Sequence, residues 1–183
     1  MIHVDVGERH TLKKEYEMTK IYRPDGAMQA GLDDLIAMIP EDKRGLCVEI
    51  GSAAGESTER FAKAFQKVIC IDPWPGNMDK YFEMFKTRMK IYPHVFWYRE
   101  TSLNGAKYIK DGSANLIYID AIHTAPHPDQ DIRAYVSKVA PGCYIGGHDY
   151  KKGKFQDVVD AVYKNFPDHF VYQFKDGSWL IQV

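Results

Sequence analysis

Cysteine, net charge and long apolar runs are all scarce in this sequence, and each absence excludes a class of protein. The three cysteines form an odd count with no C-x-x-C spacing, which argues against a disulfide framework and against a zinc site. The 24 basic and 25 acidic residues leave a net charge of −1, so no overall field draws in nucleic acid or an anionic membrane. No run has the length of a membrane span, and the N-terminus has no signal-peptide core. We therefore expect a soluble, cytoplasmic protein with neither a nucleic acid nor a membrane as partner.

The length and apolar content favour a single domain. A chain of 183 residues with 45% hydrophobic residues can bury one good core, and no linker interrupts it. We expect a polar leader over residues 1–26 and one domain over residues 27–183. The leader contains Tyr16, Tyr22 and Arg23, which could form a lid over a pocket or a contact in a homo-oligomer.

Apolar runs alternate with amphipathic segments along most of the chain. The expected strands are 46–50, 68–71, 95–98, 116–119 and 143–145, and the expected helices are 27–39, 57–65, 77–91, 102–109, 128–139 and 154–166. Such units predict parallel strands joined by right-handed crossovers, hence a doubly wound, Rossmann-like α/β sheet covered on both faces. Segments 170–174 and 179–183 flank an Asp-Gly turn with no helix between them, so they must pair antiparallel. The prediction is a mostly parallel sheet of seven strands that ends in an antiparallel hairpin.

The segment from Glu49 to Ser57 joins the first strand to the next helix through a glycine turn. A helix start beside a strand end is where α/β proteins hold small ligands, because its backbone N–H groups are free. Ala53 stands where G-x-G-x-x-G has its middle glycine, which weakens a pyrophosphate interpretation. The carboxylate of Glu49 would repel a phosphate and attract a cation. We therefore expect a ligand with a positive centre and an amino group, selected by an anionic rim of Glu49 and Asp72.

The E-x-G-x-x-x-G loop, Asp72 at the end of the second strand and the terminal hairpin together resemble the class I S-adenosylmethionine-dependent methyltransferases. Within that family they are similar to small-molecule O-methyltransferases of the macrolide-sugar and rhamnosyl type. Further motifs carry the resemblance: Asp72-Pro73-Trp74, then Asp120 with His123 and Asp131, then Pro141-Gly142 through His148-Asp149-Tyr150. The resemblance covers residues 27–183. It implies a methyltransferase that uses S-adenosylmethionine and methylates a hydroxyl of a small-molecule acceptor, a sugar among the candidates, with or without a metal.

The resemblance also implies which residues bind the cofactor. Asp72 would accept the ribose hydroxyls, Trp74 would stack near the adenine, and Ser102 would lie close to it. The full implied set is Glu49, Gly51, Ser52, Gly55, Ser57, Asp72, Trp74, Ser102 and Asp120. Alternatives stay open: a plain strand–helix turn explains the two glycines, Trp74 could simply close the core, and Ser102 could cap its helix.

Two strand ends carry the residues implied in catalysis. Asp120 follows the fourth strand, and His148 and Asp149 follow the fifth, so these three could hold one divalent ion such as Mg²⁺ or Mn²⁺. Relatives usually have a carboxylate where His148 stands, and imidazole suits Mn²⁺, Fe²⁺ or Zn²⁺ better than Mg²⁺. His148 could instead hydrogen-bond to a metal-binding side chain without contacting the ion itself. His123 would face the acceptor as a general base, with Asp120 and Asp149 completing the catalytic set, although it could also be an exposed loop histidine.

Two other functions compete with methyl transfer. A nicotinamide-dependent oxidoreductase could use a similar sheet, but the glycine fingerprint is missing. A non-catalytic module that only binds the nucleoside would keep the loop and lose the chemistry.

Overall fold

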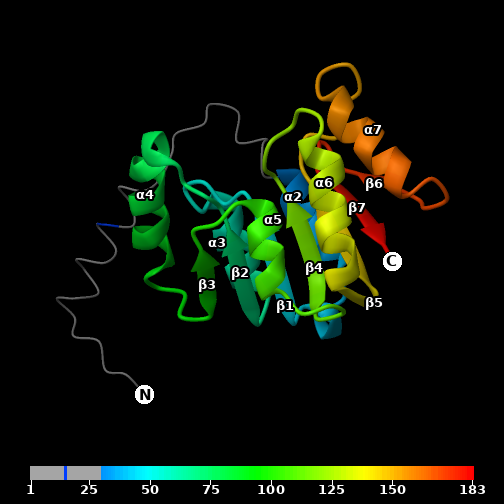
Figure 1. Ribbon diagram of the computed structural model, residues 1–183. Coiled ribbons are helices and arrows are strands. Elements are labelled where there is room, and N and C mark those ends of the chain that lie inside the picture. Colours follow the sequence, from blue (N-terminus) through cyan, green and yellow to red (C-terminus); the bar gives the residue numbers. More distant parts are fainter. Residues whose placement is uncertain (1–14, 16–29) are drawn as a thin grey trace.

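The computed structural model describes residue 15 and residues 30–183 (Figure 1). The expected lid or oligomer contact of residues 1–26 lies outside the described residues, apart from Glu15. The carboxylate of Glu15 lies 2.9 Å from the ammonium of Lys90. The role of the leader therefore stays a prediction.

Within the described residues, seven strands form one sheet in the order β3-β2-β1-β4-β5-β7-β6. The first five are parallel, and β7 pairs antiparallel with both β5 and β6. The strands are β1 (Leu46–Ile50), β2 (Lys67–Ile71), β3 (Val95–Tyr98), β4 (Ala114–Ile119), β5 (Val139–Gly147), β6 (Tyr172–Gln173) and β7 (Trp179–Gln182). This order confirms the predicted doubly wound, mostly parallel sheet with an antiparallel C-terminal pair.

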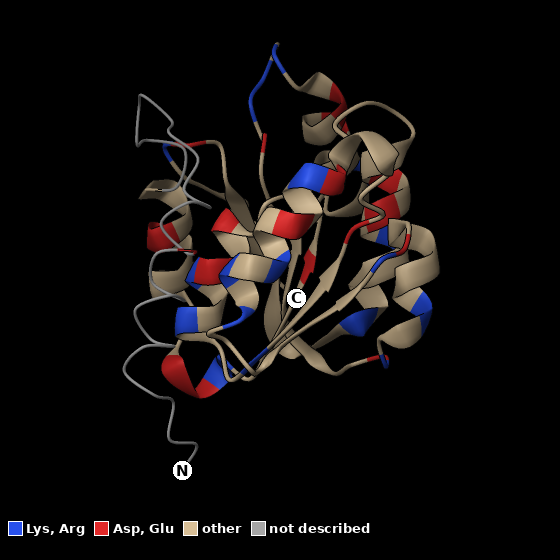
Figure 2. Ribbon diagram, turned by 90° about the vertical axis from the view of Figure 1, so that its left-hand side faces the viewer, with Lys and Arg blue, Asp and Glu red and all other residues tan. Residues whose placement is uncertain are grey.

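Helices cover both faces of the sheet, with α5 and α6 on the face seen in Figure 1. The helices are α2 (Ala30–Met38), α3 (Glu56–Ala64), α4 (Asp79–Met89), α5 (Ser102–Gly105), α6 (His127–Tyr135) and α7 (Gln156–Asn165). Because both faces are covered, the central strands β1, β2 and β4 are almost continuously apolar and buried. In the ribbon of Figure 2, acidic and basic positions are interspersed along the helices, in keeping with the near-zero net charge. In the part of the chain that the structure describes, no helix is both long and apolar enough to cross a membrane.

Some expected boundaries were wrong. The helix expected over 102–109 is a four-residue α5 followed by a 3-10 turn at Ala106–Tyr108, and α6 likewise continues as a 3-10 turn at Val136–Lys138. The strand expected over 143–145 runs from Val139 to Gly147, because Val139 already pairs with Ala114 in β4. Tertiary pairing thus took residues that local periodicity had assigned to a helix.

Strained backbone gathers at the carboxyl edge of the sheet. Among the described residues, three non-glycine residues have positive φ: Ala53 (43°), Trp74 (36°) and Asp149 (61°). They follow β1, β2 and β5, respectively. Such conformations cost free energy and tend to persist where a site depends on them. The geometry therefore indicates that the functional site lies at this edge.

Candidate active site

Two cavities open at the carboxyl edge of the sheet. The first, of about 550 Å³, lies over the ends of β1 and β2; we call it the β2-side cavity. The second, of about 380 Å³, lies towards β5; we call it the β5-side cavity. Gly51, Ala53 and Asp120 line both of them. A ligand in one cavity and a ligand in the other would therefore meet beside Asp120.

Glu49 lies beneath the glycine loop and not at its rim. Its side chain is fully buried, and its carboxylate accepts hydrogen bonds from the hydroxyls of Ser52 (2.7 Å), Ser57 and Thr58. Burial raises the pKa of Glu49 to about 7, although the three hydroxyls act in the opposite direction. The predicted anionic rim is therefore wrong for Glu49, because the hydroxyls at the start of α3 turn its carboxylate inward. Ser52 and Ser57 likewise direct their hydroxyls to Glu49, and together these groups hold the shape of the loop.

The raised pKa of Glu49 predicts a pH-dependent stability. Between its ordinary pKa of 4.5 and about 7 the folded protein binds more protons than the unfolded chain, so stability falls as pH rises through this window. A Glu49→Gln variant lacks the titrating group. We expect wild type to lose about 3 kcal/mol relative to this variant between pH 4 and pH 8, measured by urea unfolding. Glu41→Gln, a matched change at an exposed glutamate, controls for loss of a charge. An unchanged difference between wild type and Glu49→Gln at the two pH values would contradict the assignment.

Asp72 ties the ends of β1 and β2 together and lines the β2-side cavity. Its carboxylate accepts from the backbone N–H of Ala53 at 2.9 Å and from that of Trp74 at 2.7 Å. Each carboxylate oxygen can accept more than one hydrogen bond, so ligand hydroxyls can still bind there. The predicted position of Asp72 at the cavity wall is thus found.

Besides Glu49, two of the residues implied in cofactor binding line neither cavity. Trp74 is fully buried: its ring packs on Phe82 and Phe85, and its indole N–H donates to the carbonyl of Ala53 at 2.7 Å. The predicted stacking on adenine is therefore wrong, and the alternative of a core aromatic is confirmed. Gly55 is the N-cap of α3, and an added Cβ would meet the side chains of Phe85 and Met89, so this glycine permits close packing of α3 and α4.

Ser102 lines the β2-side cavity and donates a hydrogen bond to the buried carboxylate of Asp131. Asp131 lines the same cavity. The N-cap of α5 is Thr101, whose hydroxyl accepts from the backbone of Asn104. Ser102 is therefore a cavity residue and not the helix cap.

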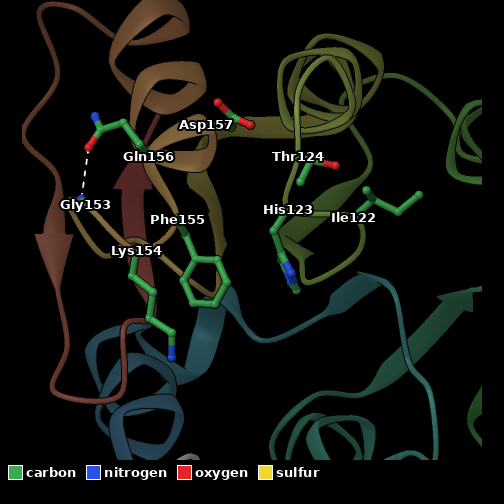
Figure 3. A pocket seen from close by; sticks show the side chains of 8 residues that line it. All are labelled: Ile122, His123, Thr124, Gly153, Lys154, Phe155, Gln156 and Asp157. Carbon is green, nitrogen blue, oxygen red and sulfur yellow. Dashed lines mark hydrogen bonds between the residues drawn. The ribbon is translucent and has the colours of Figure 1, made fainter.

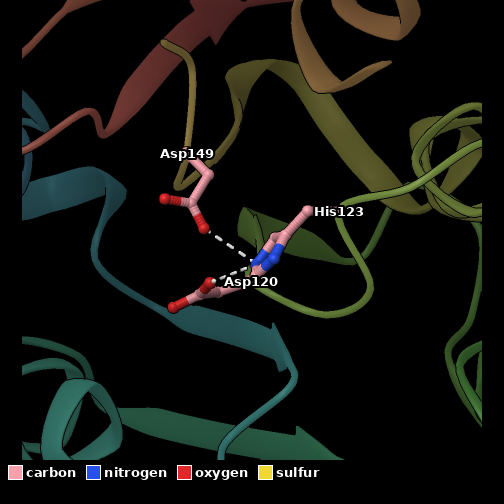
Figure 4. A group of neighbouring side chains, drawn as sticks. All are labelled: Asp120, His123 and Asp149. Carbon is pink, nitrogen blue, oxygen red and sulfur yellow. Dashed lines mark ion pairs between the residues drawn. The ribbon is translucent and has the colours of Figure 1, made fainter. Parts of the chain in front are cut away.

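Asp120, His123 and Asp149 converge in the β5-side cavity, as Figure 4 shows. The Nε2 atom of His123 lies 2.8 Å from Oδ2 of Asp149 and 3.6 Å from Oδ1 of Asp120. His148 is buried, lines the same cavity, and has its Nδ1 atom 3.2 Å from the other carboxylate oxygen of Asp149. The structure thus brings the three predicted catalytic residues together.

The charges in this group are strongly coupled. Asp120 and Asp149 raise the pKa of the half-buried His123 to about 10. Burial alone would raise the pKa of Asp149, but the neighbouring imidazoles of His123 and His148 outweigh burial and hold it well below its usual range. The ring of His123 is therefore a cation between two carboxylates, and it does not titrate near neutral pH as the sequence interpretation assumed.

The set of ligand atoms suits a divalent metal, but it differs from the predicted set. One donor atom from each of Asp120, His123 and Asp149 lies within 4.8 Å of the others. Two carboxylates and an imidazole fit Mn²⁺, Fe²⁺ or Zn²⁺, and Mg²⁺ less well. Among the described residues His148 is not part of this group, and its Nδ1 atom contacts the carboxylate of Asp149 instead. The expectation that His148 is a metal ligand is therefore corrected in favour of its alternative role as a supporting group.

Sequence reasoning missed several residues of the β5-side cavity. Tyr81 on α4 and Lys151, Lys154 and Phe155 after β5 all line it. The available signal was the run Lys151-Lys-Gly-Lys154 directly after the motif that contains Asp149. Three lysines in four positions beside a predicted active-site residue indicate a positively charged entrance to the site.

Comparison with known proteins gave one family and many similar folds. A family model described as a methyltransferase domain matches residues 48–150. Similar solved structures include the O-methyltransferase of Bacillus cereus in complex with S-adenosylhomocysteine (14% identity, TM-score 0.64, covering 100% of this chain and 92% of that one). The N-methyltransferase NodS of Bradyrhizobium japonicum, in complex with the same product, has 16% identity and a TM-score of 0.63, with 94% and 95% covered.

A TDP-rhamnose 3'-O-methyltransferase of calicheamicin biosynthesis has 13% identity and a TM-score of 0.63, covering 100% of this chain and 96% of that one. None of the curated proteins compared with the chain matches its sequence. At these identities the solved structures establish the fold and leave the acceptor open.

Proposed function

This chain belongs to the methyltransferase domain family, and we propose that it transfers a methyl group from S-adenosylmethionine to a hydroxyl of a small molecule. The observation that carries the proposal is the shared boundary of the two cavities at Asp120. A donor in the β2-side cavity and an acceptor in the β5-side cavity would place their reacting atoms on either side of this residue. Such alignment is the main requirement of an in-line displacement.

The β2-side cavity fits the donor. Its volume of about 550 Å³ lies within the usual range of small-molecule sites, and apolar residues form much of its wall. Asp72 offers carboxylate oxygens to ribose hydroxyls, and Gly51 brings backbone close to the boundary with the acceptor. When bound, S-adenosylmethionine supplies a methyl group activated by a positively charged sulfur.

The group of Asp120, His123 and Asp149 would hold the acceptor hydroxyl. A carboxylate of this group can accept the hydroxyl proton as the new bond to the methyl carbon forms. The imidazole ring of His123 lies beside the oxygen that becomes negative, and it can stabilise that charge from a fixed position. A sugar hydroxyl is one candidate acceptor, since one structural neighbour methylates a rhamnose.

We further propose that a divalent ion, Mn²⁺ or Mg²⁺, assists at this group. When bound, it would replace the proton on the ring of His123 and supply positive charge to the acceptor oxygen in its place. Dialysis against EDTA is expected to lower turnover about a hundredfold, and added Mn²⁺ or Mg²⁺ should restore it. Calorimetric titration of Mn²⁺ into wild type and into an Asp149→Asn variant gives a readout that does not depend on activity. Full activity of the chelated enzyme would exclude metal assistance.

The proposal is tested by calorimetry with S-adenosylmethionine, S-adenosylhomocysteine and NAD, followed by mass spectrometry of reactions with a panel of hydroxyl compounds. We expect binding of the first two ligands and formation of S-adenosylhomocysteine with a methylated product. Binding of NAD alone would favour an oxidoreductase. Donor binding without a methylated product from any acceptor would favour the non-catalytic module.

A further inference from the structure

The loop between β5 and α7 brings two lysines to the mouth of the β5-side cavity. Lys151, Lys154 and Phe155 line this cavity, whereas Lys152 does not. Figure 3 shows Lys154 and Phe155 extending to the same side as His123, while Gln156 and Asp157 point away. A third cavity, of about 550 Å³, adjoins the mouth and shares His123, Lys154 and Phe155 with it. Lys154 therefore stands where the acceptor site widens.

The positions of these lysines are fixed by the loop and by the C-terminal hairpin. The backbone N–H groups of Lys154 and Phe155 donate to the carbonyl of Lys151 at 3.1 and 2.9 Å. The stem of Lys151 lies across Gly177, where an added Cβ would meet its Cε at 2.4 Å. The loop is also tied to the hairpin by the N–H of Tyr150, which donates to the carbonyl of Gly177 at 2.9 Å. The two ammonium groups are thus presented by a folded turn.

Neither lysine has a carboxylate partner among the residues that the structure describes. Lys154 only lies over the ring of Phe155, with its Nζ 5.1 Å from the ring centre. Of the described acidic residues that line the same cavity, Asp120 and Asp149 face His123, and Glu56 at the start of α3 forms no ion pair with either lysine. Two cations without a carboxylate partner at the mouth of a site favour an anion there, because hydrogen bonds between two charged groups are the strong ones.

We propose that the methyl acceptor carries an anionic group, a phosphate or a carboxylate, which Lys151 and Lys154 bind while its hydroxyl lies at Asp120, His123 and Asp149. This inference rests on the proposed function and names the substrate class of the same site. The ring of Phe155 packs against the apolar part of the acceptor, between its anionic group and its hydroxyl. Phosphate and carboxylate share the required charge, and binding experiments separate them.

The test uses protein saturated with S-adenosylhomocysteine and two matched pairs of probes. Glucose and glucose 1-phosphate form the phosphate arm, catechol and 3,4-dihydroxybenzoate form the carboxylate arm, and inorganic phosphate serves as a minimal probe. The charged member of at least one pair should bind at least about tenfold more tightly by calorimetry. The double variant Lys151→Gln, Lys154→Gln should lose this preference, and added salt should weaken it in wild type. Lys152→Gln, a matched change one residue away, should keep it.

Three outcomes would overturn the inference: equal affinities within both pairs, no binding of any anionic probe, or an equal loss of preference in Lys152→Gln. The affinity for S-adenosylhomocysteine is measured first on every sample. Absence of that binding would overturn the proposed function. Normal product binding without a charge preference would overturn only the assignment of an anionic acceptor.

Discussion

An Asp149→Asn variant is expected to lose methyl transfer by about a thousandfold while it still binds S-adenosylmethionine as wild type does. Asp149 lines the β5-side cavity but not the β2-side cavity, so its loss should spare the donor. Its carboxylate contacts both His123 and His148, so the neutral amide would remove the charge on which the group depends. Single-turnover rates and calorimetry with the donor measure the two effects separately.

Asparagine is the right replacement because of the backbone at this position. Asp149 has a φ of 61°, in the left-handed region that asparagine and aspartate tolerate better than other residues with a side chain. Alanine would add backbone strain and mix a structural effect with a chemical one. The amide also keeps the size of the side chain. A fall in turnover in this variant therefore reports on the carboxylate charge.

Two further variants test whether the expected effect is specific to Asp149. Asp168→Asn removes a carboxylate from an exposed position outside the three cavities described and should change neither turnover nor donor affinity. Asp120→Asn should lower turnover and also the affinity for the donor, because Asp120 borders both cavities. Turnover in Asp149→Asn within tenfold of wild type would remove this residue from the mechanism. Parallel loss of donor binding and turnover would mark it as structural.

The fold could be predicted from sequence because its signals are local. Continuous apolar runs mark strands buried on both faces, and the amphipathic segments between them require crossovers. The antiparallel end was readable because no helix separates residues 170–174 from 179–183. The sequence did not indicate that β7 lies between β5 and β6, because that order depends on long-range pairing such as that of Ile145 with Ile181.

The sequence indicated at which edge of the sheet the candidate residues lie, but it did not indicate the direction of all their side chains. Strand ends are visible in sequence, so Asp72, Asp120 and Asp149 were placed at the correct edge. The direction of Glu49 and Trp74 depends on partners that come from other elements, namely the hydroxyls of α3 and the aromatic rings of α4. Spacing alone carries no information about those partners.

The sequence predicted His148 as the metal-binding histidine, whereas the structure places His123 with Asp120 and Asp149. The reason is again the three-dimensional path of the chain. His148 and Asp149 both follow β5 and line the same cavity, yet only Asp149 lies in one group with Asp120 among the described residues. His123 lies in a loop, whose path returns its ring to Asp149. Sequence reasoning identified all of these residues, but only the path of the loop decides which imidazole joins the two carboxylates.

A Gly51→Ala variant is expected to lose donor binding by at least a hundredfold and to be destabilised by about 3 to 5 kcal/mol. Gly51 has a φ of 88°, and an added Cβ would lie 2.1 Å from the carbonyl oxygen of Asp120. That oxygen belongs to backbone at the end of β4 and cannot move aside without disturbing the neighbouring strands. The distortion would also reach Asp120, which borders both cavities.

Gly112→Ala separates the steric clash from the backbone conformation. Gly112 also has a positive φ, 65°, but nothing lies within 4 Å of the position of an added Cβ. It should therefore be destabilised only by the left-handed conformation, about 1 to 2 kcal/mol, and should bind the donor normally. Urea unfolding and calorimetry with S-adenosylhomocysteine measure both variants. Equal destabilisation of the two would mean that the end of β4 yields to the methyl group, and unchanged donor affinity in Gly51→Ala would show that the glycine turn does not shape the donor site.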